Sequence, residues 1–268
     1  MGTPFISFLE PSKLEGFQLG SSREEQPCTV PKTFLDAMEV REEVFIKEQD
    51  VPTNNEFDND DARSCHWVVY ASVNKTEANE VRDDDGNVVQ PRKSSTRTTP
   101  IGTIRLVPFP HDPHPKAGGK YWNGVLQEGG ADADQDASKS YGTDRPTTFH
   151  DGKEAYVKVG RLAVIKEFRG HRIASLLVST VLAWLKSHPS YFDPSITELG
   201  LEQMGAANER DIPKWNGLVC AHAQTQATKA WKKWGFEADE EMGTWFEEGI
   251  SHLGVFQRLN IDPKKVRI

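Results

Sequence analysis

The spacing of apolar residues predicts strands and helices in mixed order. A period of two, or a short continuous apolar run, predicts a strand. Three such segments occur at Cys65–Val73, Pro100–Val107 and Ala155–Ile165. The third alternates at first and is then continuously apolar, which is typical of a central strand. Further short strands are expected at Leu218–Ala223 and around Phe236, Thr244 and Val255.

Three segments have helical spacing instead. The clearest is Arg172–Lys186, where apolar residues recur three and four positions apart on one face. Lys32–Glu48 and Gln226–Trp234 are the other two, and Gly235 directly after the last is a typical C-terminal stop. The order of strands and helices predicts a mixed α/β sheet flanked by helices.

Polar stretches rich in turn-forming residues interrupt this pattern. They predict long loop insertions, which are usually functional or mobile. The remaining apolar segments add up to about one ordinary domain. The predicted organisation is an N-terminal extension at 1–30, a single domain at 31–260 with insertions near 72–99, 108–152 and 187–217, and a C-terminal tail at 261–268.

The amino-acid composition disfavours some classes of binding partner. The formal net charge of −8 over 268 residues disfavours a nucleic-acid partner, because an acidic protein repels phosphate backbones. Three scattered cysteines form neither a disulfide framework nor a zinc motif. We see no secretion signal and no run of 18 apolar residues, so we expect no membrane span and a cytoplasmic location, with the nucleus left open.

One histidine pair raises the question of a metal. His111 and His114 have a suitable spacing, but two prolines interrupt the segment and no cysteine or carboxylate cluster completes a ligand set. The sequence therefore predicts no metal site.

The segment from Val159 to Ala174 carries the clearest chemical signal. A buried strand runs into a basic turn that contains Gly170, and this turn opens the long helix. Backbone N–H groups at a helix start attract anions, so the turn suits a pyrophosphate. It is neither a GxxxxGK[ST] loop nor a GxGxxG fingerprint. A plain strand-to-helix turn with solvated arginines is the alternative.

Four segments, in order, resemble the GNAT acetyltransferases and their ElaA-like branch. Residues 169–174 (RGHRIA) are similar to the [Q/R]-x-x-G-x-[G/A] motif of the family, with Arg172 where the family usually has glycine. Residues 41–60 resemble R-x-x-V-F-x-x-E-Q…E-x-D-x-x-D. Residues 223–236 resemble A-Q-x-x-A…G-F, and residues 246–252 resemble F-x-[E/D]-x-G-I-x-H. The insertions and the first thirty residues have no counterpart in the family pattern.

The resemblance implies a GNAT fold: a mixed, mostly antiparallel sheet whose central strands splay apart to admit acetyl-CoA. It implies direct attack of a neutral amine on the thioester, without a metal and without a cysteine nucleophile, so Cys220 is expected in the core. The N–H of Leu162 would face the thioester carbonyl. The implied acetyl-CoA contacts are Leu162, Ala163, Val164, Arg169, Gly170, His171, Arg172, Ile173, Ala174 and Ser175.

The sequence departs from the family at both familiar catalytic positions. Lys158 stands where many members have a glutamate base, and Trp231 where many have a tyrosine acid. The candidate replacements are His222, His252 and Glu248, since imidazole titrates near neutrality and suits proton removal from an amine. A histidine satisfied by the backbone is the alternative for His222.

The acceptor is expected to be a small primary amine such as an amino sugar, polyamine or amino-acid derivative. Glu56, Asp58 and Asp60 lie in an acidic loop suited to a cationic amine, or else form a solvated surface. A protein N-terminal or lysine acetyltransferase and a non-catalytic acyl-CoA-binding module remain the alternatives. A homodimer agrees with the resemblance, because many relatives are dimers.

Overall fold

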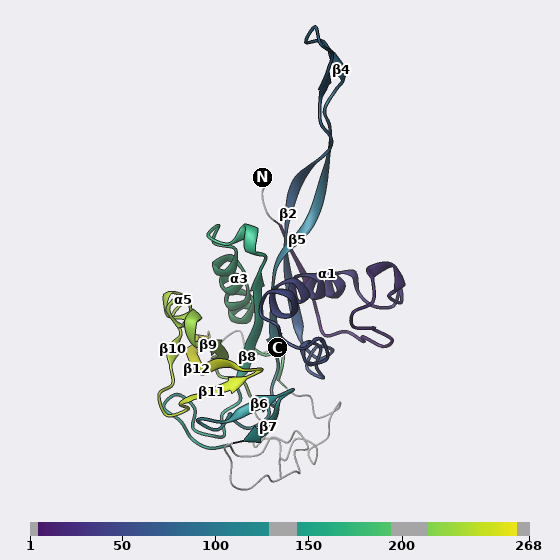
Figure 1. Cartoon of the computed structure of the whole chain (residues 1–268). Helices are drawn as coiled ribbons and strands as arrows, with labels where there is room; N and C mark the ends of the chain where they lie inside the picture. The colour runs from purple at the N-terminus through teal and green to yellow at the C-terminus, as the bar shows by residue number, and fades with distance from the viewer. Residues whose placement is uncertain (1–4, 129–143, 194–213, 262–268) are drawn as a thin grey trace.

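One mixed sheet organises the chain in this computed structural model, which describes residues 5–128, 144–193 and 214–261 (Figure 1). Across the sheet the strand order is β1-β2-β5-β8-β9-β12-β11-β6-β7, with β10 paired to β12. Adjacent strands are antiparallel except for the pairs β8–β9 and β11–β6. The strands are β1 (Phe5–Leu9), β2 (Cys65–Ala78), β5 (Lys93–Val107), β6 (Lys120–Trp122), β7 (Val125–Glu128), β8 (Val157–Val164), β9 (Leu218–Gln224), β10 (Glu237–Ala238), β11 (Thr244–Glu247) and β12 (Ile250–Arg258).

Helices cover both faces of the sheet. In Figure 1, α3 (Ile173–Ser187) and α5 (Thr228–Lys233) lie on one side and α1 (Lys32–Arg41) on the other. The π-helical turn η2 (Glu42–Glu48) continues α1 without a break, and the short α2 (Thr53–Glu56) follows it. The described 3-10 turns are η1 (Arg23–Glu25), η3 (Lys166–Phe168) and η5 (Thr225–Ala227). No helix among the described residues is long and apolar enough to cross a membrane.

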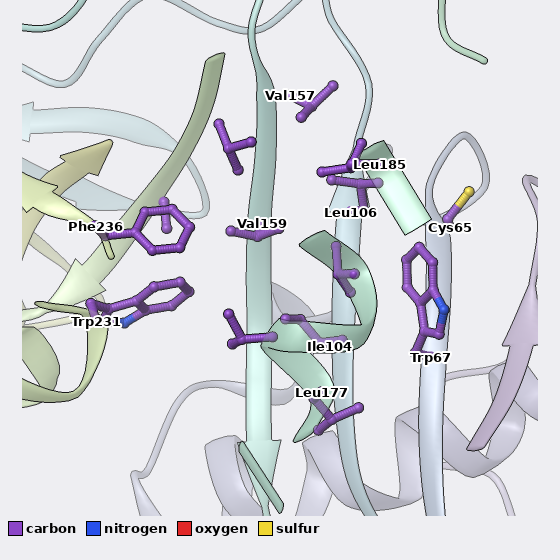
Figure 2. Close-up of a cluster of buried hydrophobic side chains, with 14 of the residues drawn as sticks. Cys65, Trp67, Ile104, Leu106, Val157, Val159, Leu177, Leu185, Trp231 and Phe236 are labelled. Atoms are coloured by element: carbon purple, nitrogen blue, oxygen red, sulfur yellow. The ribbon is translucent and has the colours of Figure 1, made fainter. Parts of the chain in front are cut away.

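The main core fills the space between α3, α5 and the sheet. Leu177, Val181 and Leu185 lie along one face of α3 and are fully buried, as the helical spacing predicts. Figure 2 shows Val159 of β8 between Trp231 and Phe236 on one side and the side chains of β5 and α3 on the other. The core therefore spans both halves of the sheet beneath α3 and α5.

The main elements predicted from the sequence are present. The helix expected at Arg172–Lys186 is α3, and the strand expected at Ala155–Ile165 is β8. The stretch 72–99, expected to be a loop, is instead a β arm that projects from the sheet (Figure 1). β2 and β5 run into this arm, and β3 (Val81–Arg82) pairs with β4 (Val88–Gln90) near its tip. Both faces of a two-stranded ribbon meet water, so no apolar alternation marks its strands.

Two further segments expected to lie outside the core join the sheet. Within residues 1–30, β1 pairs with β2, while Leu14 and Val30 pack against α1. Within 108–152, the hairpin β6–β7 pairs with β11 through parallel contacts of β6. Most of 187–217, much of 108–152 and nearly all of the tail lie outside the described residues.

Gly102 of β5 lies against side chains of α3, where there is no room for a side chain. A β-carbon at this position would lie 3.0 Å from Cγ2 of Ile173 and 3.3 Å from Cδ1 of Leu177. The same addition at Gly160 of β8 would meet no atom within 4 Å. Gly160 can therefore serve as the uncrowded control for a substitution at Gly102.

We expect Gly102→Ala to destabilise the fold by about 1–3 kcal/mol, because an overpacked core must shift α3 or its side chains. Gly160→Ala should change stability by no more than about 0.5 kcal/mol, or raise it slightly. Urea unfolding followed by circular dichroism measures both. Equal effects of the two substitutions would contradict this account of Gly102.

Candidate active site

The two central strands β8 and β9 pair over only three residues each. The parallel ladder joins Val157–Val159 to Val219–Ala221. Beyond it β8 runs on to Val164 along β5, while β9 runs on to Gln224 along β12. The edge of β8 that faces β9 is thus left without this partner past Val159. An extended ligand that carries amide groups can pair with such an edge.

A bulge shapes β8 where the strands part. Arg161 and Leu162 together stand opposite the single β5 residue Ile104, and Arg161 has a φ of 48°. A bulge adds one residue and so reverses the alternation of side chains. Val159 before the bulge and Leu162 after it both face the α3 core, although they are three positions apart. The bulge accounts for the change from an alternating to a continuous apolar pattern along this strand.

The exposed start of α3 lies just beyond β8. Arg172 caps the helix, and the first intrahelical bond runs from the N–H of Leu176 to the carbonyl of Arg172. The N–H groups of Ile173, Ala174 and Ser175 precede that bond and have no acceptor within the helix. Gly170 and Arg172 are exposed. The backbone can therefore bind an anion here, with no acidic residue in the first turn to oppose it.

His222 lies where β9 separates from β8 and forms a pair with Glu247 of β11. The Nδ1 atom of His222 is 3.0 Å from Oε1 of Glu247, and Nε1 of Trp245 donates to the same oxygen at 2.7 Å. A carboxylate only accepts, so Nδ1 carries the proton and Nε2 is the basic nitrogen. The His222 side chain is 19% exposed, which leaves it reachable.

The surroundings of His222 keep its imidazole neutral. Burial lowers the pKa of His222, and Lys158 and His252 lower it further, which outweighs the opposing effect of Glu247. Burial would raise the pKa of Glu247, but the hydrogen bonds from His222 and Trp245 hold it far below its ordinary value. A neutral imidazole oriented by an ionised carboxylate can accept a proton.

Space is open on the face to which His222 points. Val157 and Val159 face the α3 core, as do Val219 and Ala221, so Gly160 and His222 both face the opposite side of the sheet. Gly160 follows Val159 and His222 follows Ala221, which places them at the same level where the ladder ends. No atom would meet a β-carbon at Gly160 within 4 Å.

Two hydrogen-bonded bridges join the N-terminal helical segment to the C-terminal strands. Nε2 of Gln224 donates to Oε1 of Gln49 at 2.8 Å. Nδ2 of Asn55 donates to Oε2 of Glu248 at 2.8 Å, and the backbone N–H of Asn123 donates to Oε1 of Glu248 at 2.6 Å. The site is therefore bounded by α2, the β6–β7 hairpin and the β11–β12 turn.

No family model matches the chain, and no curated protein matches it. Among solved structures, Escherichia coli ElaA is 14% identical, covering 96% of this chain and 100% of its own, with a TM-score of 0.44. An acyl-CoA N-acyltransferase from Pseudomonas aeruginosa is 15% identical, covering 95% and 99%, with a TM-score of 0.45. A GNAT-family acetyltransferase from Staphylococcus aureus is 10% identical, covering 96% and 100%, with a TM-score of 0.37.

The described strands form the mixed, mostly antiparallel sheet flanked by helices that the sequence predicts. The similarity to these solved structures is low, with TM-scores of 0.44, 0.45 and 0.37. Neither the donor nor the acceptor follows from it, and the chemistry of the site rests on the chain's own residues.

The residues expected to hold acetyl-CoA fall into two groups. Leu162, Ala163 and Val164 belong to the part of β8 beyond its pairing with β9. The residues at or near the start of α3 are Gly170, His171, Arg172, Ile173, Ala174 and Ser175. Both groups remain predicted ligand contacts.

The Arg169 side chain, expected to contact the pyrophosphate, is hydrogen-bonded within the protein. Its guanidinium makes two hydrogen bonds of 2.6 Å to the carboxylate oxygens of Glu48, and its Nε donates to the carbonyl of Val164 at 2.9 Å. These contacts tie the turn to η2 and engage the planar donor fork. Arg169 thus positions the turn, and its contact with a phosphate stays a prediction.

The three catalytic candidates have different surroundings. His222 forms the pair with Glu247, as described. His252 is 9% exposed, and its Nδ1 is 2.8 Å from the carbonyl of Ile250 on its own strand. Glu248 holds Asn55 and Asn123 in the bridge and stands in the β11–β12 turn with a φ of 51°. This geometry favours His222, with Glu248 in a structural position.

The acidic loop is neutralised by buried arginines. Arg41 pairs with Glu56 and Asp61, with Nε and Nη1 each 2.6 Å from a carboxylate oxygen. Arg105 also binds Asp61, at 2.8 Å. The side chains of all four residues are buried, with exposed fractions of 5% or less. Attraction of a cationic amine by Glu56 is therefore not supported.

The other two acidic candidates are also paired. Asp58 binds Arg105 at 2.6 Å and Arg161 at 3.0 Å, while Asp60 binds Arg63 at 2.9 Å. Asp58 nevertheless remains 28% exposed and so stays a predicted substrate contact, as does Asp60 at 14%. A left-handed φ costs a non-glycine residue about 1–2 kcal/mol. The ion pair with Asp58 helps to hold Arg161 in this strained conformation.

Sequence reasoning missed Glu247, Gln49 and Gln224 as partners. Glu247 lies within the segment that resembles the family ending, two positions after Trp245 on the same face of β11. That alternation indicates that Glu247 and Trp245 face the same side. The pairing of Glu247 with His222, however, depends on β12 lying between β9 and β11. Cys220 is fully buried, as expected, and burial raises the pKa of its thiol to about 12.

We expect Arg41→Met to destabilise the fold by about 3–5 kcal/mol, because the carboxylates of Glu56 and Asp61 would remain buried without this partner. The control is Arg82→Met, since Arg82 pairs with Glu80 at the exposed surface. The control should change stability by about 0.5 kcal/mol or less. Urea unfolding compares the two, and a small loss for Arg41→Met would overturn the role of the network.

Arg172 has a φ of 62°, a conformation that favours glycine. We expect Arg172→Gly to stabilise the fold by about 0.5–1 kcal/mol through relief of this strain. Arg172→Ala removes the same charge but keeps the β-carbon, so it should bring no such gain. Thermal unfolding of both variants separates strain from charge, and equal stabilities would argue against strain.

Proposed function

We propose that this chain transfers an acetyl group from acetyl-CoA to the primary amine of a small molecule. The observation that carries the proposal is the coincidence of three features at one place: the open edge of β8 past Val159, the exposed start of α3, and His222 at the level where the strands part. Each feature matches one requirement of the reaction.

The donor requires an extended site with an anion-binding end. The backbone from Leu162 to Val164 would pair with the amide-containing arm of acetyl-CoA, whose thioester supplies the acetyl group. The N–H groups at the start of α3 would hold its pyrophosphate. Arg169 fixes the turn between these two parts through Glu48. The residues present therefore fit an acyl-CoA.

The acceptor requires a base, because an alkylammonium ion must lose a proton before its nitrogen attacks the thioester carbon. The attack forms the amide bond and breaks the C–S bond, and CoA leaves as a thiolate that takes up the second proton released by the amine. His222 is neutral and takes the ammonium proton on Nε2 in our proposal. Glu247 accepts the hydrogen bond from Nδ1, holds the ring orientation and stabilises the imidazolium that forms. This pair replaces the usual glutamate, whose position is occupied here by Lys158.

The bridges around the site favour a small acceptor over a peptide. The Asn55–Glu248 and Gln49–Gln224 contacts connect the two sides that an open peptide groove would have to separate. The amine class itself is assigned by experiment.

The first test is thiol release from acetyl-CoA with hexosamines, polyamines, amino acids, arylamines and short peptides as acceptors. Turnover with one class of small amine is expected. Turnover with peptides alone would indicate a protein acetyltransferase. CoA binding by calorimetry without turnover would indicate an acyl-CoA-binding module, and no CoA binding at all would refute the donor site.

His222→Ala should lower kcat/KM by about 10²–10⁴-fold while the Kd for CoA stays unchanged. His188→Gln is the control, since His188 is an exposed histidine at the end of α3. Full activity of His222→Ala would exclude His222 as the base.

The pH profile tests the pair separately. The neutral form of His222 is required, so activity should fall on the acid side with an apparent pKa below the ordinary value of about 6.5. Glu247 raises the pKa of His222, so Glu247→Gln should move this acid limb to lower pH as well as reduce kcat. A shift to higher pH would contradict the assigned partnership.

A further inference from the structure

The insertion at 108–152 brings together two histidines and an aspartate that the acetyl-transfer proposal does not use. His114 lies on the first limb of the insertion, and Asp144 and His150 lie on the second. One potential ligand atom from each side chain lies within 4.8 Å of the other two. Both histidines are 4% exposed. His111, paired with His114 in the sequence analysis, instead contacts the carbonyl of Tyr156 and is not part of this cluster.

The hydrogen bonds around His150 and Asp144 orient lone pairs into the cluster. Nε2 of His150 is 2.9 Å from the carbonyl of Glu154, to which it donates. That bond leaves Nδ1 of His150 with its lone pair toward His114. The carboxylate of Asp144 accepts the backbone N–H of His114 and that of Arg145, each at 2.7 Å. Protein ligands of metals are typically held by such second contacts.

The interior of the cluster is incompletely satisfied. The Nδ1 atom of His114 is buried without a hydrogen-bond partner among the described residues. It faces Oδ2 of Asp144 at 3.7 Å, too far for a hydrogen bond. With metal–ligand distances near 2.1 Å, two ligands of one tetrahedral ion lie about 3.4 Å apart. The spacing of this pair is close to that value.

The nitrogens of His114 and His150 lie nearer, with Nε2 of His114 2.8 Å from Nδ1 of His150. This contact satisfies two neutral rings, but it leaves Nδ1 of His114 opposite a carboxylate. One imidazole binds one ion through one nitrogen, so His114 would use Nδ1, and His150 would turn from its contact with Nε2 to share that ion. Since both histidines lie in loops that lead to β strands, such an adjustment does not require the sheet to move.

We propose that His114, Asp144 and His150 bind one divalent transition-metal ion of the zinc class. Two imidazoles and one carboxylate suit zinc, whereas calcium and magnesium prefer oxygen ligands. The ion joins residues 36 positions apart and so fastens the two limbs of the insertion. His114 packs on Tyr156 and Phe256, which places the ion beneath the face of the sheet that carries His222. Its role is structural.

The test uses the full chain after removal of metal with a chelator and dialysis. Calorimetric titration with zinc chloride should show one saturable site, and cobalt chloride should produce the visible absorption of a tetrahedral cobalt ion. Zinc should also raise the midpoint of thermal unfolding, because it binds the folded state. These readouts do not depend on enzyme activity or on CoA.

Asp144→Asn and His150→Ala should each weaken zinc binding by about tenfold or more and abolish the zinc-dependent rise in thermal midpoint. His188→Gln removes an exposed histidine and should leave both unchanged. Asp144→Asn preserves side-chain shape, so it keeps the test valid if His150→Ala fails to fold. No saturable binding by the parent chain, or equal binding by Asp144→Asn and the parent, would overturn the proposal and leave a hydrogen-bonded histidine pair.

Discussion

The site depends on an interrupted hydrogen-bond ladder between two parallel strands. β8 and β9 are joined at Val157–Val159 and Val219–Ala221 and then separate, each remaining paired to its outer neighbour. Separated strands would normally rejoin, because unpaired backbone groups are costly away from water. Here the bulge at Arg161 and Leu162 lies in the part of β8 that extends beyond the ladder with β9. A ligand could replace the missing strand contacts at this opening.

Other interactions must hold the two halves of the sheet around this opening. Beneath it, the core under α3 and α5 is continuous across both halves, as Val159 between Trp231 and Leu106 illustrates (Figure 2). Above it, the Gln49–Gln224 contact links the end of η2 to the end of β9. The opening is therefore bounded by a continuous apolar core on one side and a polar bridge on the other.

Ion pairs also position the segments around the opening. Arginines 41, 105 and 161 neutralise the acidic loop, and this network supports the strained residue of the bulge from the side. Buried charges of this kind stabilise a structure less than they specify it, since desolvation offsets much of the attraction. We infer that the network sets the position of the 49–64 loop against β8. The carboxylates that the sequence places near a cationic substrate are mostly used for that purpose.

The long insertions have become parts of the molecule with separate tasks. The arm at 72–99 extends two strands away from the core, whereas the β6–β7 hairpin within 108–152 returns to the sheet and pairs with β11 (Figure 1). Through Asn123 and Glu248 that hairpin also borders the site. The histidine cluster lies in the loops on either side of it. The hairpin within the insertion therefore forms one border of the candidate site.

The sequence by itself determined the elements whose burial imposes a period. The α3 face with Leu177 and Val181 and the strand β8 follow from apolar spacing, and the exposed turn before α3 follows from Gly170 and its basic neighbours. A buried face requires apolar side chains at a fixed spacing, so the local sequence is enough to predict these elements. The resemblance to GNAT motifs predicted the mixed, mostly antiparallel sheet in the same way, through short segments.

Only the tertiary structure decided which distant polar groups meet. His222 and Glu247 are brought together by the strand order β9-β12-β11, and Arg169 meets Glu48 across more than a hundred residues of chain. The same holds for the β arm at 72–99, whose strands have no buried face, and for His114 with His150. Hydrogen bonds and ion pairs need partners within about 3 Å, and no periodicity records which partner that is. Apolar burial, by contrast, needs only an interior, which the spacing of residues along the chain already defines.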